Sequence, residues 1–237
     1  MTEKILKYLC GILLVTALTF GLFFRDTDKA ESVFLNYPLN DYVIVLDAGH
    51  GGDDGGAIGI KTLTREKDIN LSITLKLARL FESVGATVIL TRADENALCK
   101  NGFNKMEDMR SRAEIIELSR PYVVLSIHCN SFPQSKNVKG AQTFYYPGSL
   151  TGEALAESIQ ESLSEMVDPK NKRQVKSEDF YMLRHGNSTN VMIECGFLSC
   201  PEEEVLLIDD NYQNKLSYAI FDGTCKYILK ANTPDNI

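Results

Sequence analysis

Several patterns are scarce or missing in this chain of 237 residues, and each absence excludes a class of protein. Lys and Arg number 25 against 32 Asp and Glu, so the net charge is −7 and no surplus of positive charge is left for a nucleic-acid backbone. The six cysteines contain no Cys-x-x-Cys pair, and no repeat or low-complexity segment occurs. We therefore expect a globular domain that binds no nucleic acid and uses its cysteines mainly as small apolar residues.

A long uncharged run lies at the N-terminus. Residues 8–24 (YLCGILLVTALTFGLFF) carry no charge, and Lys4 and Lys7 precede them. The run is long for a signal-peptide core and slightly short for a transmembrane helix, so both alternatives stay open. The basic flank predicts that the rest of the chain lies outside the cytoplasmic membrane. We divide the chain into a signal peptide or membrane anchor (1–25), a linker (26–41) and a folded domain (42–232).

Beyond the linker, apolar strand patterns alternate with helical ones. Residues 42–47 (YVIVLD) form a continuous apolar run typical of a buried strand. Further strands are expected at 86–91, 122–127, 141–146, 179–183 and 191–194. Helices are expected at 66–84 and 106–120, after a cap at Thr151, after a capping box at Ser199–Glu202, and at 212–230. The alternation predicts an α/β fold with a mostly parallel central sheet and helices on both faces.

Chemically active residues follow three of these strands. The first strand ends in DAGHGGDDGG (47–56), which contains His50, a later strand leads into His128, and another ends at Glu194. Glu66 stands at the start of the first helix. Because the carboxyl ends of parallel strands meet at one edge, these residues are expected to lie together. Two imidazoles and a carboxylate are the ligand set that catalytic zinc prefers, and a second carboxylate can act as base.

The glycine-rich stretch fits other kinds of loop less well. A phosphate-binding loop would need a Lys, and Asp53 and Asp54 would repel the anion. The spacing of oxygen ligands does not fit a calcium loop. A glycine-rich turn with a purely structural histidine remains an alternative, weakened because two of only three histidines fall at strand ends. The third, His185, could replace one of the proposed ligands.

Five motifs stand in the order in which they occur in a known family. They are IVLDAGHGGDDGGAIG, TREKDINL, LTR, SIHCNS and VMIECGFLSCPEE. On these motifs the chain resembles the zinc-dependent N-acetylmuramoyl-L-alanine amidases, from about Tyr42 to Lys230. Cys129 and Cys200 stand where small or polar residues are commoner in the family. The short form, with an N-terminal apolar segment and no wall-binding module, is similar to the germination-specific amidases of spore-forming bacteria.

The resemblance implies a function and a division of roles. It implies one Zn²⁺ ion bound by His50, Glu66 and His128, with Glu194 as the catalytic base. The substrate would be peptidoglycan, cut between N-acetylmuramic acid and L-alanine, in processing of the spore cortex toward muramic δ-lactam. The enzyme would then act at the outer face of the membrane, in the forespore intermembrane space or in the cell wall, with the N-terminal segment contacting the membrane.

Further roles are less sharply defined by the sequence. Asn130 could orient the substrate or only close a turn, and Arg92 could bind a wall carboxylate or form an ion pair with Asp94 or another acid. Two other functions are carried as alternatives: a catalytically silent peptidoglycan-binding protein, and a zinc carboxypeptidase or deacetylase acting on the same polymer. The sequence does not show whether an accessory protein regulates the site.

Overall fold

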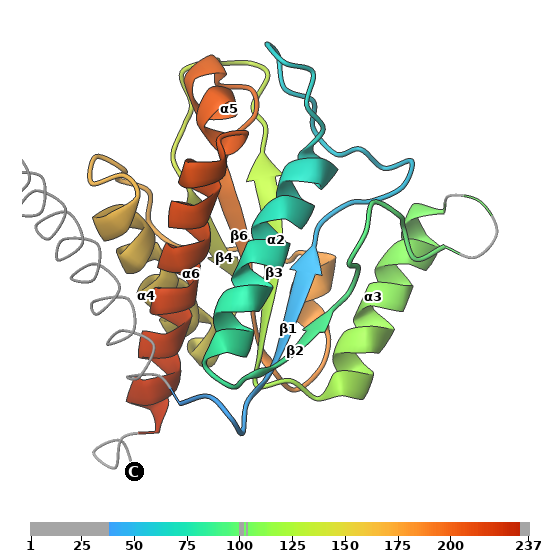
Figure 1. The fold of residues 1–237 in the computed structure, drawn as a ribbon, viewed down its shortest axis with the longest axis vertical. Helices are drawn as coiled ribbons and strands as arrows, with labels where there is room; N and C mark the ends of the chain where they lie inside the picture. Colours follow the sequence, from blue (N-terminus) through green and yellow to red (C-terminus); the bar gives the residue numbers. More distant parts are fainter. Residues whose placement is uncertain (1–37, 100–101, 103, 233–237) are drawn as a thin grey trace, which may run out of the picture. The chain divides into compact units, whose positions relative to one another are not determined.

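The computed structural model describes residues 38–99, 102 and 104–232 (Figure 1). The expected N-terminal segment (1–25) and most of the expected linker (26–41) lie outside these residues. Within them, no helix is long and apolar enough to cross a bilayer. Core packing already begins at Leu39, which is fully buried and donates its N–H to the carbonyl of Val84. Leu39, which falls in the expected linker, is therefore packed with the residues of the expected domain.

A six-stranded sheet forms the centre of the fold, with the strand order β2-β1-β3-β6-β4-β5. The strands are β1 (Val43–Ala48), β2 (Thr87–Leu90), β3 (Val123–Asn130), β4 (Gln142–Tyr145), β5 (Lys176–Ser177) and β6 (Thr189–Phe197). Neighbours from β2 to β6 run parallel, whereas β4 is antiparallel to β6 and carries the short β5 at its outer edge. The carboxyl ends of β1, β3 and β6 consequently meet at one edge.

Helices cover both faces of this sheet, which confirms the predicted α/β architecture (Figure 1). One face carries α2 (Glu66–Ser83), α4 (Leu150–Met166) and α6 (Asp210–Ala231). The α4–α6 contact is close, because a Cβ on Gly223 would lie 2.6 Å from the Cα of Ile159. The other face carries α3 (Lys105–Ser119) and the 3₁₀ helix η1 (Tyr181–Arg184), while the short α5 (Pro201–Leu207) follows β6.

Alternation along the strands decides which side chains reach the α3 face. Val45 packs there against Ile116 of α3 and Val124 of β3. Two residues further along β1, Asp47 forms an ion pair with Arg112 of the same helix. The face that bears α3 and η1 is therefore apolar near the start of the strands and polar toward their carboxyl ends.

Three local expectations are wrong: one strand and two helix caps. The apolar run at 179–183 is not a strand: Phe180 and Leu183 pack with β4 and β6 residues, and η1 covers that end of the sheet. Helix α4 is capped by Ser149, whose hydroxyl accepts the N–H of Gly152, rather than by Thr151. No capping box opens α5, because the Ser199 hydroxyl instead accepts the N–H of Phe132.

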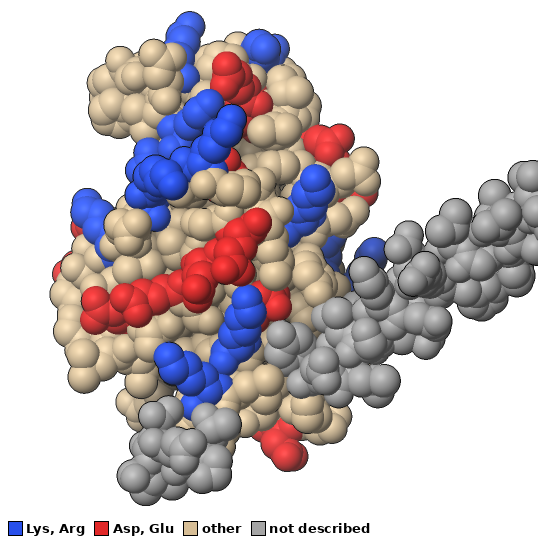
Figure 2. All heavy atoms as spheres, turned by 90° about the vertical axis from the view of Figure 1, so that its left-hand side faces the viewer, with Lys and Arg blue, Asp and Glu red and all other residues tan. Residues whose placement is uncertain are grey.

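The surface over α4 has a mixed charge pattern. Its glutamates recur at four-residue steps, at positions 153, 157, 161 and 165, and three of them are exposed. Lys226 of α6 lies 3.8 Å from the carboxylate of Glu165. Figure 2 shows this side of the molecule, where a band of acidic side chains crosses the surface between basic ones.

Candidate metal and catalytic site

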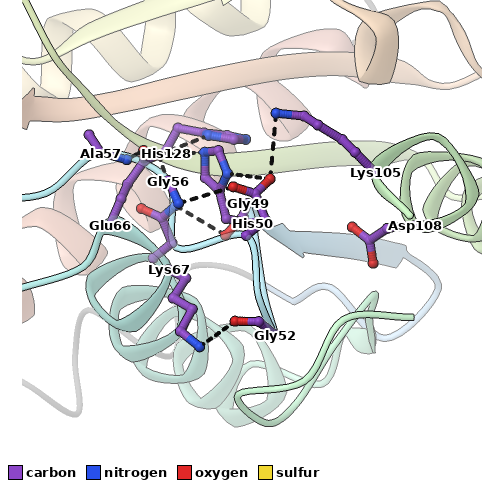
Figure 3. Close-up of polar contacts among 12 residues, drawn as sticks. Gly49, His50, Gly52, Gly56, Ala57, Glu66, Lys67, Lys105, Asp108 and His128 are labelled. Carbon is purple, nitrogen blue, oxygen red and sulfur yellow. Dashed lines mark hydrogen bonds and ion pairs between the residues drawn. The ribbon is translucent and has the colours of Figure 1, made fainter. Parts of the chain in front are cut away.

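The strand ends bring the predicted site residues together. His50 lies in the loop after β1, His128 near the end of β3 and Glu194 on β6, while Glu66 is the first residue of α2. His128 and Glu194 are direct register partners across the β3–β6 pair. Figure 3 shows His50, Glu66 and His128 converging from these separate elements.

Three of these side chains are spaced as ligands of one ion would be. Nε2 of His50 and Nδ1 of His128 each lie 3.1 Å from Oε1 of Glu66. One ligand atom from each residue falls within 4.8 Å of the other two. Ligands around a tetrahedral zinc ion, with bonds of about 2.0–2.2 Å, stand roughly 3.3–3.6 Å apart. The described residues thus contain a His-Glu-His group that could hold one metal ion, with the donor types that zinc prefers.

Two glycines of the loop after β1 leave the space in which these ligands sit. A Cβ on Gly49 would lie 2.2 Å from Cε1 of His128, which is much closer than van der Waals contact allows. Gly56 has a positive φ of 66°, and a Cβ there would lie 2.5 Å from Oε2 of Glu66. The glycine-rich sequence is therefore required by close approach as well as by backbone conformation.

Glu66 is held as an ionised carboxylate. Burial opposes its charge, but hydrogen bonds from His128 and His50 outweigh that effect and keep its pKa well below the usual range. Asn70 and the N–H of Cys129 also donate to Oε1, both at 3.1 Å. The N–H of Ala57 donates to Oε2 at 2.8 Å. Asn70, one helical turn after Glu66, had no assigned role in the sequence although its spacing of four residues places it on the same helix face.

Glu194 is a different kind of carboxylate. Its Oε2 is buried and has no hydrogen-bond partner among the described residues. Burial raises the pKa of Glu194 to about 7, with the charge of His128 opposing the rise and that of Glu66 adding to it. The side chain lines a cavity of about 340 Å³ together with His50 and His128, and Met109, Tyr181 and Met192 form part of its apolar wall. A buried oxygen without a partner, beside a possible ion site, is suited to receive a proton from a bound molecule.

An ion pair beneath the site ties the loop after β1 to α3. Asp47 accepts bonds from Arg112, Thr91 and Ser126. Burial works against ionisation of Asp47, but Arg112 and the two hydroxyls lower its pKa to about 2. Arg112 also donates to the carbonyl of His50, so it fixes the backbone of one proposed ligand. Asp47 belongs to the first sequence motif, yet no sequence pattern indicated that its partner would be Arg112.

Arg92 contacts the main chain around the site. It is buried, and its guanidinium donates to the main-chain carbonyls of Ala48, Gly49, Lys67 and Asp94. The contact with Asp94 is to its backbone and is no ion pair with its carboxylate. With these four hydrogen bonds, the buried guanidinium of Arg92 holds the loop after β1 in place. A role toward a wall carboxylate stays a prediction.

Asn130 and the third histidine lie outside the His-Glu-His group. Oδ1 of Asn130 accepts the N–H of Ser131 at 2.8 Å, which closes a turn at the end of β3. Its role toward substrate stays a prediction. His185 precedes β6 and its Nδ1 lies 3.1 Å from a carboxylate oxygen of Glu117 on α3, so it does not replace His50 or His128 in the group.

The cysteines of the described residues are free thiols. Cys99, Cys129, Cys195, Cys200 and Cys225 form no disulfide with one another, and all but Cys99 are buried. Burial raises the pKa of the Cys129 thiol well above its ordinary value. Cys129 contacts the site only through its backbone N–H, which donates to Glu66.

Comparisons with known proteins give a consistent result. A family model described as N-acetylmuramoyl-L-alanine amidase matches residues 44–226. The germination-specific N-acetylmuramoyl-L-alanine amidase of Bacillus subtilis (strain 168) is 34% identical over 236 residues, covering 98% of this chain and 97% of that protein. The CwlD amidase of Clostridioides difficile, solved in complex with the GerS lipoprotein, is 44% identical with a TM-score of 0.77, over 80% of this chain and 100% of that one. An N-acetylmuramoyl-L-alanine amidase of Clostridium difficile 630 is 30% identical with a TM-score of 0.74, over 82% and 100%.

Proposed function

The chain belongs to the N-acetylmuramoyl-L-alanine amidase family, and we propose that it performs this hydrolysis with one zinc ion held by His50, Glu66 and His128. The bond cleaved joins the lactyl carboxyl of N-acetylmuramic acid to the L-alanine of the stem peptide in peptidoglycan. One observation carries the proposal: three ligand atoms lie within 4.8 Å of one another, and two of their residues, His50 and His128, line one cavity with Glu194. The buried Oε2 of Glu194 has no hydrogen-bond partner among the described residues.

Each residue has a separate task in this proposal. Zinc in such a site supplies Lewis acidity, which polarises the amide carbonyl and makes water a better nucleophile at neutral pH. Glu66 contributes one negative charge, so the site keeps a net positive charge with a divalent ion. Glu194 takes a proton from the attacking water as the water oxygen bonds to the carbonyl carbon. It then gives that proton to the alanine nitrogen as the carbon–nitrogen bond breaks, which yields a lactyl carboxylic acid and a free amine. At neutral pH the acid proton passes to the amine, so the products are a carboxylate and an ammonium group.

Digestion of purified peptidoglycan tests the reaction. An amidase releases a free α-amino group on L-alanine and an intact lactyl carboxylate on the sugar. A carboxypeptidase would instead free a D-amino acid, a deacetylase would free acetate, and a silent binding protein would release neither. Metal analysis of the purified protein, beside the same analysis of His128→Ala, identifies the ion and links it to the group. New ends other than N-terminal L-alanine would overturn the proposal.

The cellular role is proposed from similarity to the germination-specific amidase of Bacillus subtilis. We assign this chain to processing of spore cortex peptidoglycan, where removal of stem peptides precedes formation of muramic δ-lactam. The test is complementation of a Bacillus subtilis strain that lacks its own germination-specific amidase, followed by muropeptide analysis of the spores. Appearance of muramic δ-lactam with the wild-type chain, but not with Glu194→Gln, is expected. Its absence with an expressed and active enzyme would contradict the role.

Location and partners complete the proposal. A cortex substrate places the enzyme outside the cytoplasmic membrane, in the forespore intermembrane space or the cell wall, with residues 1–25 as export signal or membrane anchor. The similar CwlD amidase was solved in complex with the GerS lipoprotein, which supports an accessory protein for this chain as well. Co-purification from sporulating cells, with the membrane and soluble fractions analysed separately, tests both statements.

A further inference from the structure

One carboxylate of the glycine-rich loop has no role in the mechanism above, although it touches a proposed ligand. Oδ2 of Asp54 lies 3.0 Å from Nδ1 of His50, but the contact does not have the geometry of a hydrogen bond, and Nδ1 is buried with no hydrogen-bond partner among the described residues. Nε2 of the same ring lies 3.1 Å from Oε1 of Glu66. The two nitrogens of His50 thus meet two different carboxylates. Of these two carboxylates, only Glu66 belongs to the His-Glu-His group.

A tight turn brings Asp54 back to His50. The N–H of Gly51 donates to the carbonyl of Asp54 and the N–H of Asp54 donates to the carbonyl of Gly51, both at 3.0 Å. Gly51 and Gly52 have φ values of 147° and 55°, which favour glycine. His50 itself has a φ of 63°, uncommon for a residue with a side chain. The sequence HGGDD therefore folds so that the fourth residue after His50 faces its ring.

The Asp54 carboxylate is itself fixed in orientation. Its Oδ1 accepts the N–H of Gly56 at 3.1 Å, and its Oδ2 is the oxygen that lies 3.0 Å from Nδ1 of His50. Nζ of Lys105, from α3, lies 3.5 Å from Oδ2 (Figure 3). Asp53, the preceding carboxylate, is exposed and lies on the outside of the turn. The two neighbouring aspartates are therefore not equivalent.

We propose that Asp54 is a positioning residue that accepts the Nδ1 proton of His50 and thereby presents Nε2, unprotonated, to the metal ion. The inference rests on the proposed function, since it concerns a ligand of the proposed zinc site. Partners of this kind fix the tautomer and ring orientation of a ligating histidine and raise its basicity. It also explains why the loop carries a carboxylate at this position among so many glycines.

Asp54→Asn separates this role from a merely structural one. The amide oxygen can keep the bond to Gly56, which turns the amide NH₂ toward Nδ1 of His50. Two donors cannot share that contact, so the ring is driven to the tautomer with its proton on Nε2, the nitrogen needed for the metal. Asp54→Asn, although nearly isosteric, should thus weaken zinc binding at least as much as Asp54→Ala does.

The experiment measures zinc affinity by competition with a chromogenic chelator, for the wild type, Asp54→Asn, Asp54→Ala and the matched control Asp53→Asn. We expect both Asp54 variants to bind zinc about 10–100-fold more weakly than wild type. Asp53→Asn should bind as the wild type does. Melting curves of the metal-free proteins establish that each variant is folded. Because the chain has only three histidines, ¹⁵N-histidine NMR of the metal-free proteins can follow the ring tautomer of His50 directly.

The outcomes separate this inference from the proposed function. Wild-type affinity in a folded Asp54→Asn protein, with an unchanged His50 tautomer, overturns the role of Asp54 and leaves the zinc site intact. If Asp54→Ala does not fold, Asp54→Asn alone decides. If the wild type binds no zinc, or binds it equally well as His50→Ala, the metal site fails and this inference fails with it.

Discussion

His128 and Glu194 stand directly opposite each other on the parallel strands β3 and β6. Their side chains enter the same cavity from one face of the sheet. The register of a strand pair is fixed by the burial pattern of all its residues, because a shift by one residue would turn every side chain to the other face. The distance between proposed ligand and proposed base is thus set by the core of the domain rather than by a flexible loop.

Glu194→Gln should abolish hydrolysis without removing the metal. The amide is nearly isosteric but cannot take a proton from water, so we expect kcat to fall by about 10²–10⁴-fold. Zinc content should stay at the wild-type level, since Glu194 is outside the His-Glu-His group. Rates are measured on purified peptidoglycan and zinc by elemental analysis of the same samples. Wild-type turnover in this variant would mean that another group is the base.

His50→Ala and His128→Ala should each lose zinc as well as activity. Each removes one of the three proposed ligands of the His-Glu-His group. His185→Ala serves as the matched control, because its ring lies beside Glu117 on α3 and outside the group. Elemental analysis after dialysis should give zinc in the wild type and in His185→Ala only. Retention of zinc in His50→Ala would remove that residue from the ligand set.

Much of this arrangement was predictable because it depends on periodic patterns. Continuous apolar runs indicated the buried parallel strands, and the edge at which they end follows from their direction. His50, His128 and Glu194 all lie at or after the ends of such runs, so the sequence alone predicts that they lie close together. Glu66 was harder to place from the residues alone, since a glutamate at a helix start is also favoured by the helix dipole.

The partners of the site residues were not predictable, because they come from distant parts of the chain. Arg112 reaches Asp47 across 65 positions, from a helix whose sequence shows no special feature at that residue. Arg92 followed a strand in the manner of a binding residue, but its burial depends on how α2 packs over the loop after β1. Burial and tertiary hydrogen bonds of this kind leave no periodic trace in a single sequence.

Asp47→Asn should weaken the fold more than the site chemistry. The change leaves the buried guanidinium of Arg112 with Asp108 as its remaining carboxylate partner. Breaking a buried pair in this way costs about 3–5 kcal/mol in the free energy of unfolding. Urea unfolding of the metal-free proteins at pH 7 measures the difference. An equal free energy of unfolding for wild type and variant would show that the pair contributes nothing net.

The same pair predicts how stability depends on acid. The pKa of Asp47 is lowered from 3.8 to about 2, so its ionised form favours the folded state. This contribution is present above pH 3.8 and is lost as the pH falls through about 2. The difference in free energy of unfolding between wild type and Asp47→Asn should therefore be constant from pH 7 to about 5 and shrink by about 2 kcal/mol toward pH 2. A difference that does not change over that range would contradict the assignment of the lowered pKa to Asp47.

Gly56→Ala should disrupt the proposed zinc site, and Gly148→Ala is its matched control. Both glycines have positive φ, 66° and 82°, so both alanines carry a similar backbone penalty of about 1–2 kcal/mol. A Cβ at Gly148 meets nothing within 4 Å, whereas at Gly56 it would press on Glu66 and on the His50 ring. The two variants should therefore have similar free energies of unfolding. Gly56→Ala should nevertheless bind zinc more weakly and hydrolyse peptidoglycan more slowly than Gly148→Ala. Equal zinc affinity in the two folded variants would show that crowding at Gly56 does not position the ligands.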